Sequence, residues 1–394
     1  MKRDFAFKAS TFLLAGTLGG AFLTQTACKK SGPDIKIGVI AELSGDIPAV
    51  GDSCKKAAEL AVAEINEAGG VEVAGTKHLL RLFIEDSQGK AQPAAEAARR
   101  LIEQEQVLAI VGPSASLGAV PAAQVAEEGK TLLITPWGSA PRVTRDDTGA
   151  TRKWVYRTCF TDAVQGAALA KFASGYIKAT KIAILFNASS EAPKSQAELM
   201  KKAIEARSGQ IVAFETYAAG EKDLSAQWKK IAEAAPDLVF LPSYYSEVPE
   251  QIKQARAAGV RAPFLGSDTW GNPELLKNAA EVEGAYFGAH YNPDAMEDNV
   301  GIYRAAFEHR YAKEVPDDGA ALTYDTMRLL KVALETATGH DREAVREAFS
   351  KITSFDGVTG KIVFKGGSPD PVKSVVLKQF KGGKSTYVTN IDPD

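Results

Sequence analysis

The sequence predicts an α/β protein made of two lobes, each built on a doubly wound parallel sheet. Short, continuous apolar runs alternate with longer segments whose apolar residues recur at helical spacing. This alternation is typical of parallel strands that are covered by helices on both faces. The pattern runs as far as Ile134 and starts again at Asp162, and a chain of 394 residues is too long for one ordinary core. We therefore expect two lobes.

The first lobe begins after a short linker. The segment 52–68 shows the helical spacing of apolar residues clearly, and Gly69 and Gly70 end it. The expected strands are 35–40, 79–84, 107–111 and 131–134, and the expected helices are 52–68, 91–104 and 118–128.

The second lobe repeats the same rhythm, and the chain then becomes mostly helical over 299–350. Two strand-like segments follow, with a turn at Gly366–Pro369 between them. The expected helices of this part are 162–177, 194–207, 222–234 and 247–258, and the expected strands are 181–186, 211–216, 237–241, 263–266, 360–364 and 372–380.

Composition and motifs argue against several classes of function. The formal net charge is −2 and no basic field suggests nucleic-acid binding. The four histidines have no metal-ligand spacing, and no phosphate-binding GxxxxGK loop occurs. Gly112-Pro113-Ser114 lacks the GxSxG pattern of a nucleophile elbow. We therefore expect no metal, no cofactor and no enzymatic activity.

The N-terminus reads as an export signal over residues 1–27. Basic residues precede the apolar run 9–23, which is shorter than the roughly 20 residues of a spanning helix. Cys28 then opens a linker over 28–34 and resembles the lipidated cysteine of bacterial lipoproteins, although Gln25 replaces the usual leucine. We expect export to the periplasm or cell envelope with a lipid anchor on Cys28. The alternative is cleavage after Ala27 and release of a soluble protein.

With Cys28 assigned to the lipid, Cys54 and Cys159 are the two other cysteines. An export compartment permits a disulfide between them, but pairing requires close Cα atoms. Two buried thiols are the alternative, and we favour it.

Two loops between 108 and 141 are the first candidates for a binding site. They follow neighbouring strands, so both should open at the edge of the sheet where open α/β sheets bind ligands. The first loop leads into a helix N-terminus, which suits an anion. Ser116 would add a hydroxyl there, and Ser139 could meet the same ligand from the next loop. The alternative is that Ser114 or Ser116 only caps the helix.

Several separate motifs, in order along the mature chain, resemble the periplasmic branched-chain amino-acid-binding proteins, the type I solute-binding family. These motifs are IKIGVIAELSGDIPAVGDSCKKAAELAVAEINEAGGV, LAIVGPSASLGAVPAAQVAEEGKTLLITPWGSAP, AAGEKDLSAQWKKI, LVFLPSYYSEVPEQIKQARAAGV, FLGSDTWGNPELL and ALTYDTMRLLKVALE. The resemblance implies a bilobed receptor that closes like a flytrap, with three crossovers between the lobes. It places one lobe at 35–158 plus 292–368 and the other at 159–291 plus 369–394.

The resemblance also implies a set of ligand-binding residues. The family's serine that holds the ligand carboxylate falls on Ser116, and its threonine, which contacts carboxylate and ammonium, falls on Ser139. The position that offers a backbone carbonyl is Trp137. Tyr244 matches the tyrosine of the second lobe, and Asp268 matches the acidic partner of the ligand ammonium.

The chain departs from the family where the ligand side chain would lie. Val50 replaces an aromatic residue, and Glu191 stands near the position of a tyrosine. Trp137 and Trp270 could rebuild an apolar wall, and Glu191 could favour a ligand with a distal donor or cation. Surface or packing roles are the alternatives for Val50, Glu191 and Trp270.

The resemblance implies an extracytoplasmic receptor, expected to be a monomer, that passes its ligand to an inner-membrane ABC permease. The expected ligand is a small zwitterion, a branched-chain or other apolar amino acid. Two alternatives stay open, a binder of an amide or other small organic solute and a sensory ligand-binding module for a membrane partner.

Overall fold

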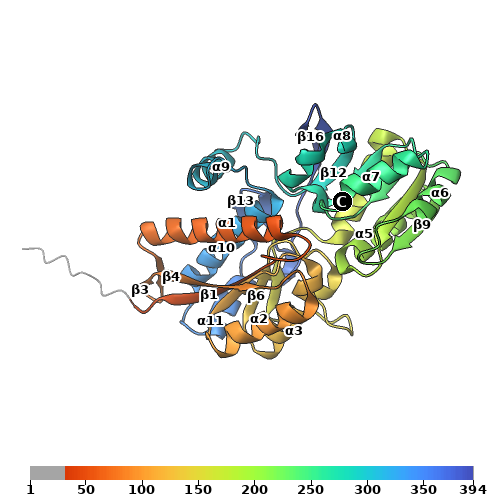
Figure 1. Cartoon of the computed structure of the whole chain (residues 1–394). Helices are drawn as coiled ribbons and strands as arrows, with labels where there is room; N and C mark the ends of the chain where they lie inside the picture. Colours follow the sequence, from red (N-terminus) through yellow and green to blue (C-terminus); the bar gives the residue numbers. More distant parts are fainter. Residues whose placement is uncertain (1–31, 394) are drawn as a thin grey trace, which may run out of the picture.

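The computed structural model describes residues 32–393. The predicted signal peptide and Cys28 lie outside these residues. The described chain forms two lobes that lie side by side (Figure 1). Within 32–393 no helix is both long enough and apolar enough to cross a membrane.

The first lobe is built on a fully parallel five-stranded sheet. The first strand lies inside the sheet, second from one edge, with Val39 paired to Ile84 on one side and to Val111 on the other. The order is β4 (Leu80–Asp86), β1 (Ile35–Ala41), β5 (Ala109–Val111), β6 (Leu132–Thr135) and β7 (Val155–Arg157). This is a doubly wound order, and the strand order reverses between β1 and β5, which is the switch point of the sheet.

Helices cover both faces of this sheet (Figure 1). Small alanines on the covering helices, such as Ala57 and Ala97, let the backbones approach the sheet closely. One face carries α1 (Pro48–Glu67), α9 (Asp298–Arg310), α10 (Asp318–Thr336) and α11 (Arg342–Ser350), and the other carries α2 (Ala91–Glu103) and α3 (Ser116–Glu128).

The second lobe repeats the same strand order and adds two antiparallel strands at one edge. Its apolar core on one side extends into the first lobe through residues such as Ile47 and Trp137. The strands lie in the order β9 (Gln210–Tyr217), β8 (Lys181–Asn187), β10 (Leu238–Leu241), β11 (Phe264–Gly266), β12 (Tyr286–Ala289), β15 (Val375–Lys381) and β16 (Lys384–Ile391). One face carries α4 (Asp162–Phe172) and α5 (Glu191–Ala206), and the other carries α6 (Ser225–Glu233), α7 (Val248–Ala257) and the short α8 (Ala279–Val282).

Three chain segments cross between the lobes, after β7, after β12 and before β15. The predicted fold class, two doubly wound lobes joined by three crossovers, is therefore confirmed. The residue-level boundaries of the lobes stay a prediction. Cys54 and Cys159 are both buried, free thiols, as favoured from the sequence.

The sequence missed the shortest and the most polar strands. β7 and β12 have 3 and 4 residues, too few to show a period. β16 alternates weakly because it is half-buried, and its antiparallel pairing makes the second sheet mixed rather than purely parallel. The missed strands also include both strands of one hairpin, β2 (Val71–Val73) with β3 (Thr76–His78). Of a second hairpin, β13 (Ser354–Gly357) was missed, whereas its partner β14 (Gly360–Val363) lies at the strand expected over 360–364.

The packing of α1 on the end of β1 depends on Gly51, because a Cβ there would collide with the backbone of Glu42. We expect Gly51→Ala to lower the free energy of unfolding by about 1–3 kcal/mol, as overpacking does. Gly301→Ala is the control, since it adds a methyl group to α9 where nothing lies within 4 Å. It should leave stability unchanged or raise it by up to about 1 kcal/mol. Urea unfolding measures both, and equal stability of Gly51→Ala and the parent would contradict this account.

Candidate functional site

A small inner cavity lies where the carboxyl ends of the two sheets face each other. The space between its lining atoms, counted together with its open mouth, is about 210 Å³. Open α/β sheets bind ligands at this edge, near the point where the strand order reverses. The residues around it come from both lobes and are Ser114, Ala115, Ser116, Trp137, Ser139, Ala192, Gln196, Tyr244, Asp268 and Thr269. The structure thus brings together the five residues predicted to bind a ligand, Ser116, Trp137, Ser139, Tyr244 and Asp268.

The N-terminus of α3 forms one wall of the inner cavity. The cap residue is Ala115, which makes no side-chain cap hydrogen bond, so neither serine caps this helix. Ser116 is buried, and its hydroxyl oxygen accepts a hydrogen bond from the Ala140 amide at 3.2 Å. Backbone N–H groups in a first helical turn have no acceptor within the helix, and the helix dipole favours an anion there. This wall is therefore suited to a carboxylate.

Glu42, which sequence reasoning missed, holds the loop that leads into α3. Its side chain is fully buried, and one carboxylate oxygen accepts hydrogen bonds from the amides of Ser114 at 3.1 Å and Ala115 at 2.9 Å. Burial raises the pKa of Glu42 to about 7, although these amides oppose the rise. Glu42 follows β1 directly, and its contact with the loop before α3 is a tertiary feature that the first motif does not reveal.

The loop after β6 supplies Trp137 and Ser139. Arg157 is fully buried and fixes this loop, because its guanidinium donates to the carbonyl oxygens of Gly138 and Ala140. Ser139 lies near Asp162, whose pKa burial raises to about 6 while the Ser139 and Ser195 hydroxyls oppose the rise. Trp137 is almost fully buried, so its indole packs against the cavity wall.

Asp268 forms the opposite wall and is the most highly coordinated carboxylate at the site. It is 1% exposed. Its Oδ1 accepts from Gln165 Nε2 at 2.9 Å and Gln196 Nε2 at 3.0 Å, and its Oδ2 lies 3.0 Å from His290 Nε2. Burial lowers the pKa of His290 to about 4, against the effect of Asp268, so the imidazole is neutral at pH 7. Sequence reasoning did not identify these three partners, which come from α4, α5 and the crossover after β12.

Tyr244 separates the inner cavity from a larger outer cavity between the lobes. The outer cavity has a volume of about 1440 Å³ and shares Ala115 and Tyr244 with the inner one. Burial raises the pKa of the Tyr244 phenol well above its usual value, and the Ser190 hydroxyl opposes this. Aliphatic residues of the outer cavity include Ile47, Leu117 and Leu224; its charged residues are Asp46, Glu221, Lys222, Glu247 and Glu250.

The three residues predicted for the ligand side chain do not line either cavity. Val50 is buried where α1 meets Gly319, and Trp270 is fully buried and donates its indole N–H to the Leu241 carbonyl at 3.1 Å. Glu191 lies 3.4 Å from Arg142 in an ion pair between the lobes. These placements agree with the packing and surface roles that were the alternatives for these positions.

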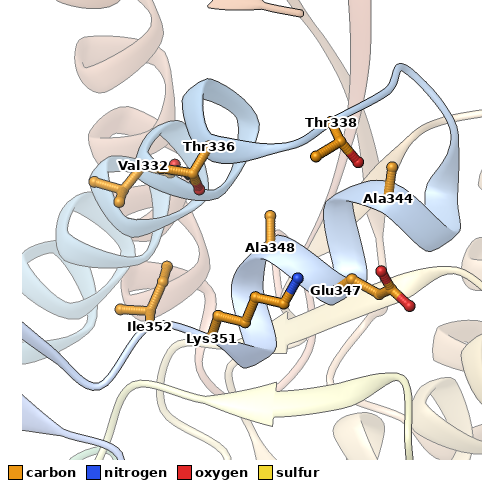
Figure 2. A pocket seen from close by; sticks show the side chains of 8 residues that line it. All are labelled: Val332, Thr336, Thr338, Ala344, Glu347, Ala348, Lys351 and Ile352. Carbon is orange, nitrogen blue, oxygen red and sulfur yellow. Dashed lines mark hydrogen bonds between the residues drawn. The ribbon is translucent and has the colours of Figure 1, made fainter.

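A separate depression lies within the first lobe, between the end of α10 and α11 (Figure 2). Its volume is about 490 Å³, and small or aliphatic side chains line most of it. Glu347 and Lys351 are its charged residues. It is remote from the cavities between the lobes. Across residues 32–393, no cluster of three or more histidine, cysteine, aspartate or glutamate side chains is arranged to hold a metal ion.

Two lobes that share a five-strand order, three crossovers and a cavity between the sheet ends define a bilobed ligand-binding protein. Residues 34–384 match the family model described as periplasmic binding protein. The chain therefore belongs to the periplasmic binding protein family.

Similar proteins cover nearly the whole chain. The Leu/Ile/Val-binding protein BraC3 of Rhizobium johnstonii is 29% identical over 89% of this chain and 93% of its own length. The structure of a leucine-binding protein, LivK, of Thermotoga maritima is 30% identical, with a TM-score of 0.83, and covers 91% of this chain and 99% of its own. The branched-chain amino acid transporter substrate-binding protein LivJ of Streptococcus pneumoniae, in complex with isoleucine, is 28% identical, with a TM-score of 0.82; the match covers 91% of this chain and 100% of LivJ.

The raised pKa of Glu42 predicts a pH-dependent stability. The carboxyl stays protonated in the folded state up to about pH 7, whereas its usual pKa is 4.5. Between these values the unfolded state binds fewer protons, so the free energy of unfolding falls as the pH rises. Between pH 4.5 and about pH 7, the free energy of unfolding of the parent should fall by roughly 3 kcal/mol more than that of Glu42→Gln.

Urea unfolding from pH 4 to pH 8 tests this account of Glu42. Glu67, an exposed residue at the end of α1, provides the control. The pH profile of Glu67→Gln should follow that of the parent. Parallel pH profiles for Glu42→Gln and the parent would show that Glu42 is not the group responsible.

Proposed function

We propose that this protein is an extracytoplasmic receptor that binds a small zwitterionic amino acid between its lobes and delivers it to an ABC importer. The observation that carries the proposal is the polarity of the inner cavity. One lobe offers a helix N-terminus with two hydroxyls, and the other offers the carboxylate of Asp268. A zwitterion is the ligand that complements both walls at once.

Ser116 and Ser139 are the proposed donors to the ligand carboxylate, together with the first amides of α3. Asp268 is the proposed acceptor for the ammonium. Its three side-chain partners are neutral, so they leave its negative charge without a countercharge. Trp137 and Tyr244 enclose these polar groups, and exclusion of water strengthens the hydrogen bonds between them.

The ligand side chain would extend past Tyr244 toward the aliphatic part of the outer cavity. Ile47, Leu117 and Leu224 there favour a branched-chain or other apolar side chain. The names of the relatives support the same ligand class, since BraC3 is a Leu/Ile/Val-binding protein and the LivJ structure contains isoleucine.

Direct contacts between the lobes support binding by closure. Asn272 Nδ2 of the second lobe donates to Asp317 Oδ2 of the first at 2.7 Å, and Arg142 pairs with Glu191. A ligand that touches both walls stabilises the arrangement in which these contacts form. The cavity offers hydrogen bonds on two sides of a ligand. We propose that the protein binds this ligand and releases it chemically unchanged.

Removal of the ammonium acceptor should weaken binding strongly. The loss of one partner from a buried, hydrogen-bonded charge pair costs about 2–5 kcal/mol. At roughly 1.4 kcal/mol per tenfold, Asp268→Ala should weaken L-leucine, L-isoleucine or L-valine by well over tenfold. Ser116→Ala should cost less, about 1–3 kcal/mol, because backbone donors remain. Calorimetric titration measures both variants, after circular dichroism has confirmed that each is folded. Unchanged affinity in Asp268→Ala would rule out ammonium binding at this residue.

We also propose that the chain is exported and anchored through Cys28. The predicted signal and Cys28 are the basis, and membership in a periplasmic family supports export. Mass spectrometry of the native N-terminus should find a chain that begins at Cys28 and carries lipid. A chain that begins at an unmodified Cys28 would contradict only the lipid anchor, whereas an intact Met1 would contradict export.

A further inference from the structure

Two side chains at the inner cavity carry buried polar atoms without a hydrogen-bond partner. They are Oε1 of Gln196, on the second lobe, and Nε1 of Trp137, on the first. Gln196 is 2% exposed and Trp137 is 6% exposed. A buried polar atom without a partner is destabilising, and most such atoms in native proteins are satisfied. Because both residues line the cavity, a ligand bound there can supply the missing partner of each atom.

The chemistry of Asp268 fixes the orientation of the Gln196 amide. Gln196 lies 3.0 Å from Asp268 Oδ1, and an ionised carboxylate only accepts hydrogen bonds. Gln196 must therefore present its NH₂ group to Asp268, and its carbonyl oxygen must point elsewhere. Ala192 lies one turn earlier on α5 and also lines the cavity, so this face of the helix is turned toward it.

Asp268 alone offers too few free positions for a ligand ammonium. A carboxylate has about four acceptor positions, and a primary ammonium has three N–H donors. Gln165, Gln196 and His290 already occupy three positions on Asp268. An ammonium at this wall therefore needs a further acceptor beside Asp268, and Gln196 Oε1 is an unoccupied acceptor on a residue that contacts it.

We propose that Gln196 determines specificity for an α-amino acid over the corresponding carboxylic acid, by accepting a hydrogen bond from the ligand ammonium through Oε1 while its NH₂ group holds Asp268. This inference rests on the proposed function and assigns a residue that the family resemblance did not supply. The indole N–H of Trp137 can only donate, and it lies on the wall proposed for the carboxylate. The two unpartnered atoms thus have the polarity that a zwitterion requires.

The test compares L-leucine with 4-methylpentanoate, which is leucine without its amine. Gln196→Met keeps the length of the side chain and removes both polar groups. We expect it to weaken L-leucine about tenfold or more, the usual loss for a hydrogen bond to a charged group. The affinity for 4-methylpentanoate should change by less than about threefold, so the preference for the amino acid falls.

Gln165→Met is the matched control. Gln165 also donates to Asp268 Oδ1, but it is not among the residues that line the cavity. This variant loses the same kind of donor to Asp268, and in addition the acceptor of the Asp268 backbone amide, but no proposed ligand contact. It should therefore keep most of the preference for leucine. If Gln196→Met does not fold, Gln196→Ala provides the same comparison.

The outcomes separate the two proposals. If the parent binds no amino acid, both the proposed function and this inference fail. If the parent binds leucine and Gln196→Met keeps the same preference over 4-methylpentanoate, only the role of Gln196 is overturned. An equal loss of preference in Gln165→Met would also overturn it, because support of Asp268 would then explain the effect.

Discussion

The carboxylate of Asp268 is the interaction on which the site and its connection to the rest of the fold depend. A buried carboxylate is tolerated only when hydrogen bonds replace the water it has lost. Here the replacements come from three different elements, so the carboxylate joins α4, α5 and the crossover after β12. His290 extends this connection, because its backbone amide donates to Asp318 at the start of α10 in the other lobe and its ring stacks on Phe160. The group proposed to hold the ligand is thus hydrogen-bonded to the crossover after β12, and His290 connects it to Phe160, which follows β7.

The other wall is organised in the same way, with a buried carboxylate that fixes a loop rather than a ligand. Glu42 binds the amides before α3, and Arg157 binds the carbonyls of the loop after β6. Arg157 also pairs with Asp370 at 2.7 Å, which ties this loop to the third crossover. Nearby, the buried Lys373 donates to the Thr359 hydroxyl at 2.5 Å, and burial lowers the pKa of Lys373 to about 8. The polar groups around the crossovers therefore fix the positions of the two cavity walls relative to each other.

The regular α/β rhythm was readable from the sequence because each buried strand is an apolar run and each helix has one apolar face. The end of α1 and both ends of β8 lie within one residue of the predicted ones for this reason, whereas α1 begins at Pro48, about one turn before the expected start at residue 52. The antiparallel edge was not readable, since β16 mixes polar and apolar residues on a half-buried surface. Among the candidate site residues, the five that sit at strand ends meet around one cavity. Val50 and Trp270 do not, because each is buried within its own lobe, and Glu191 does not, because it pairs with Arg142 of the other lobe.

The sequence by itself determined the fold class, the repeat of the lobes and the strand-end residues, because local periodicity and short motifs encode them. The tertiary structure alone decided which groups surround Asp268 and which hold the loop before α3. Gln165, Gln196 and His290 lie outside the quoted motifs, and Glu42 lies within the first motif but carries no sign of its role there. Their roles arise only when separate elements bring a carboxylate and its donors within hydrogen-bond distance, and that juxtaposition leaves no periodic signal in the sequence.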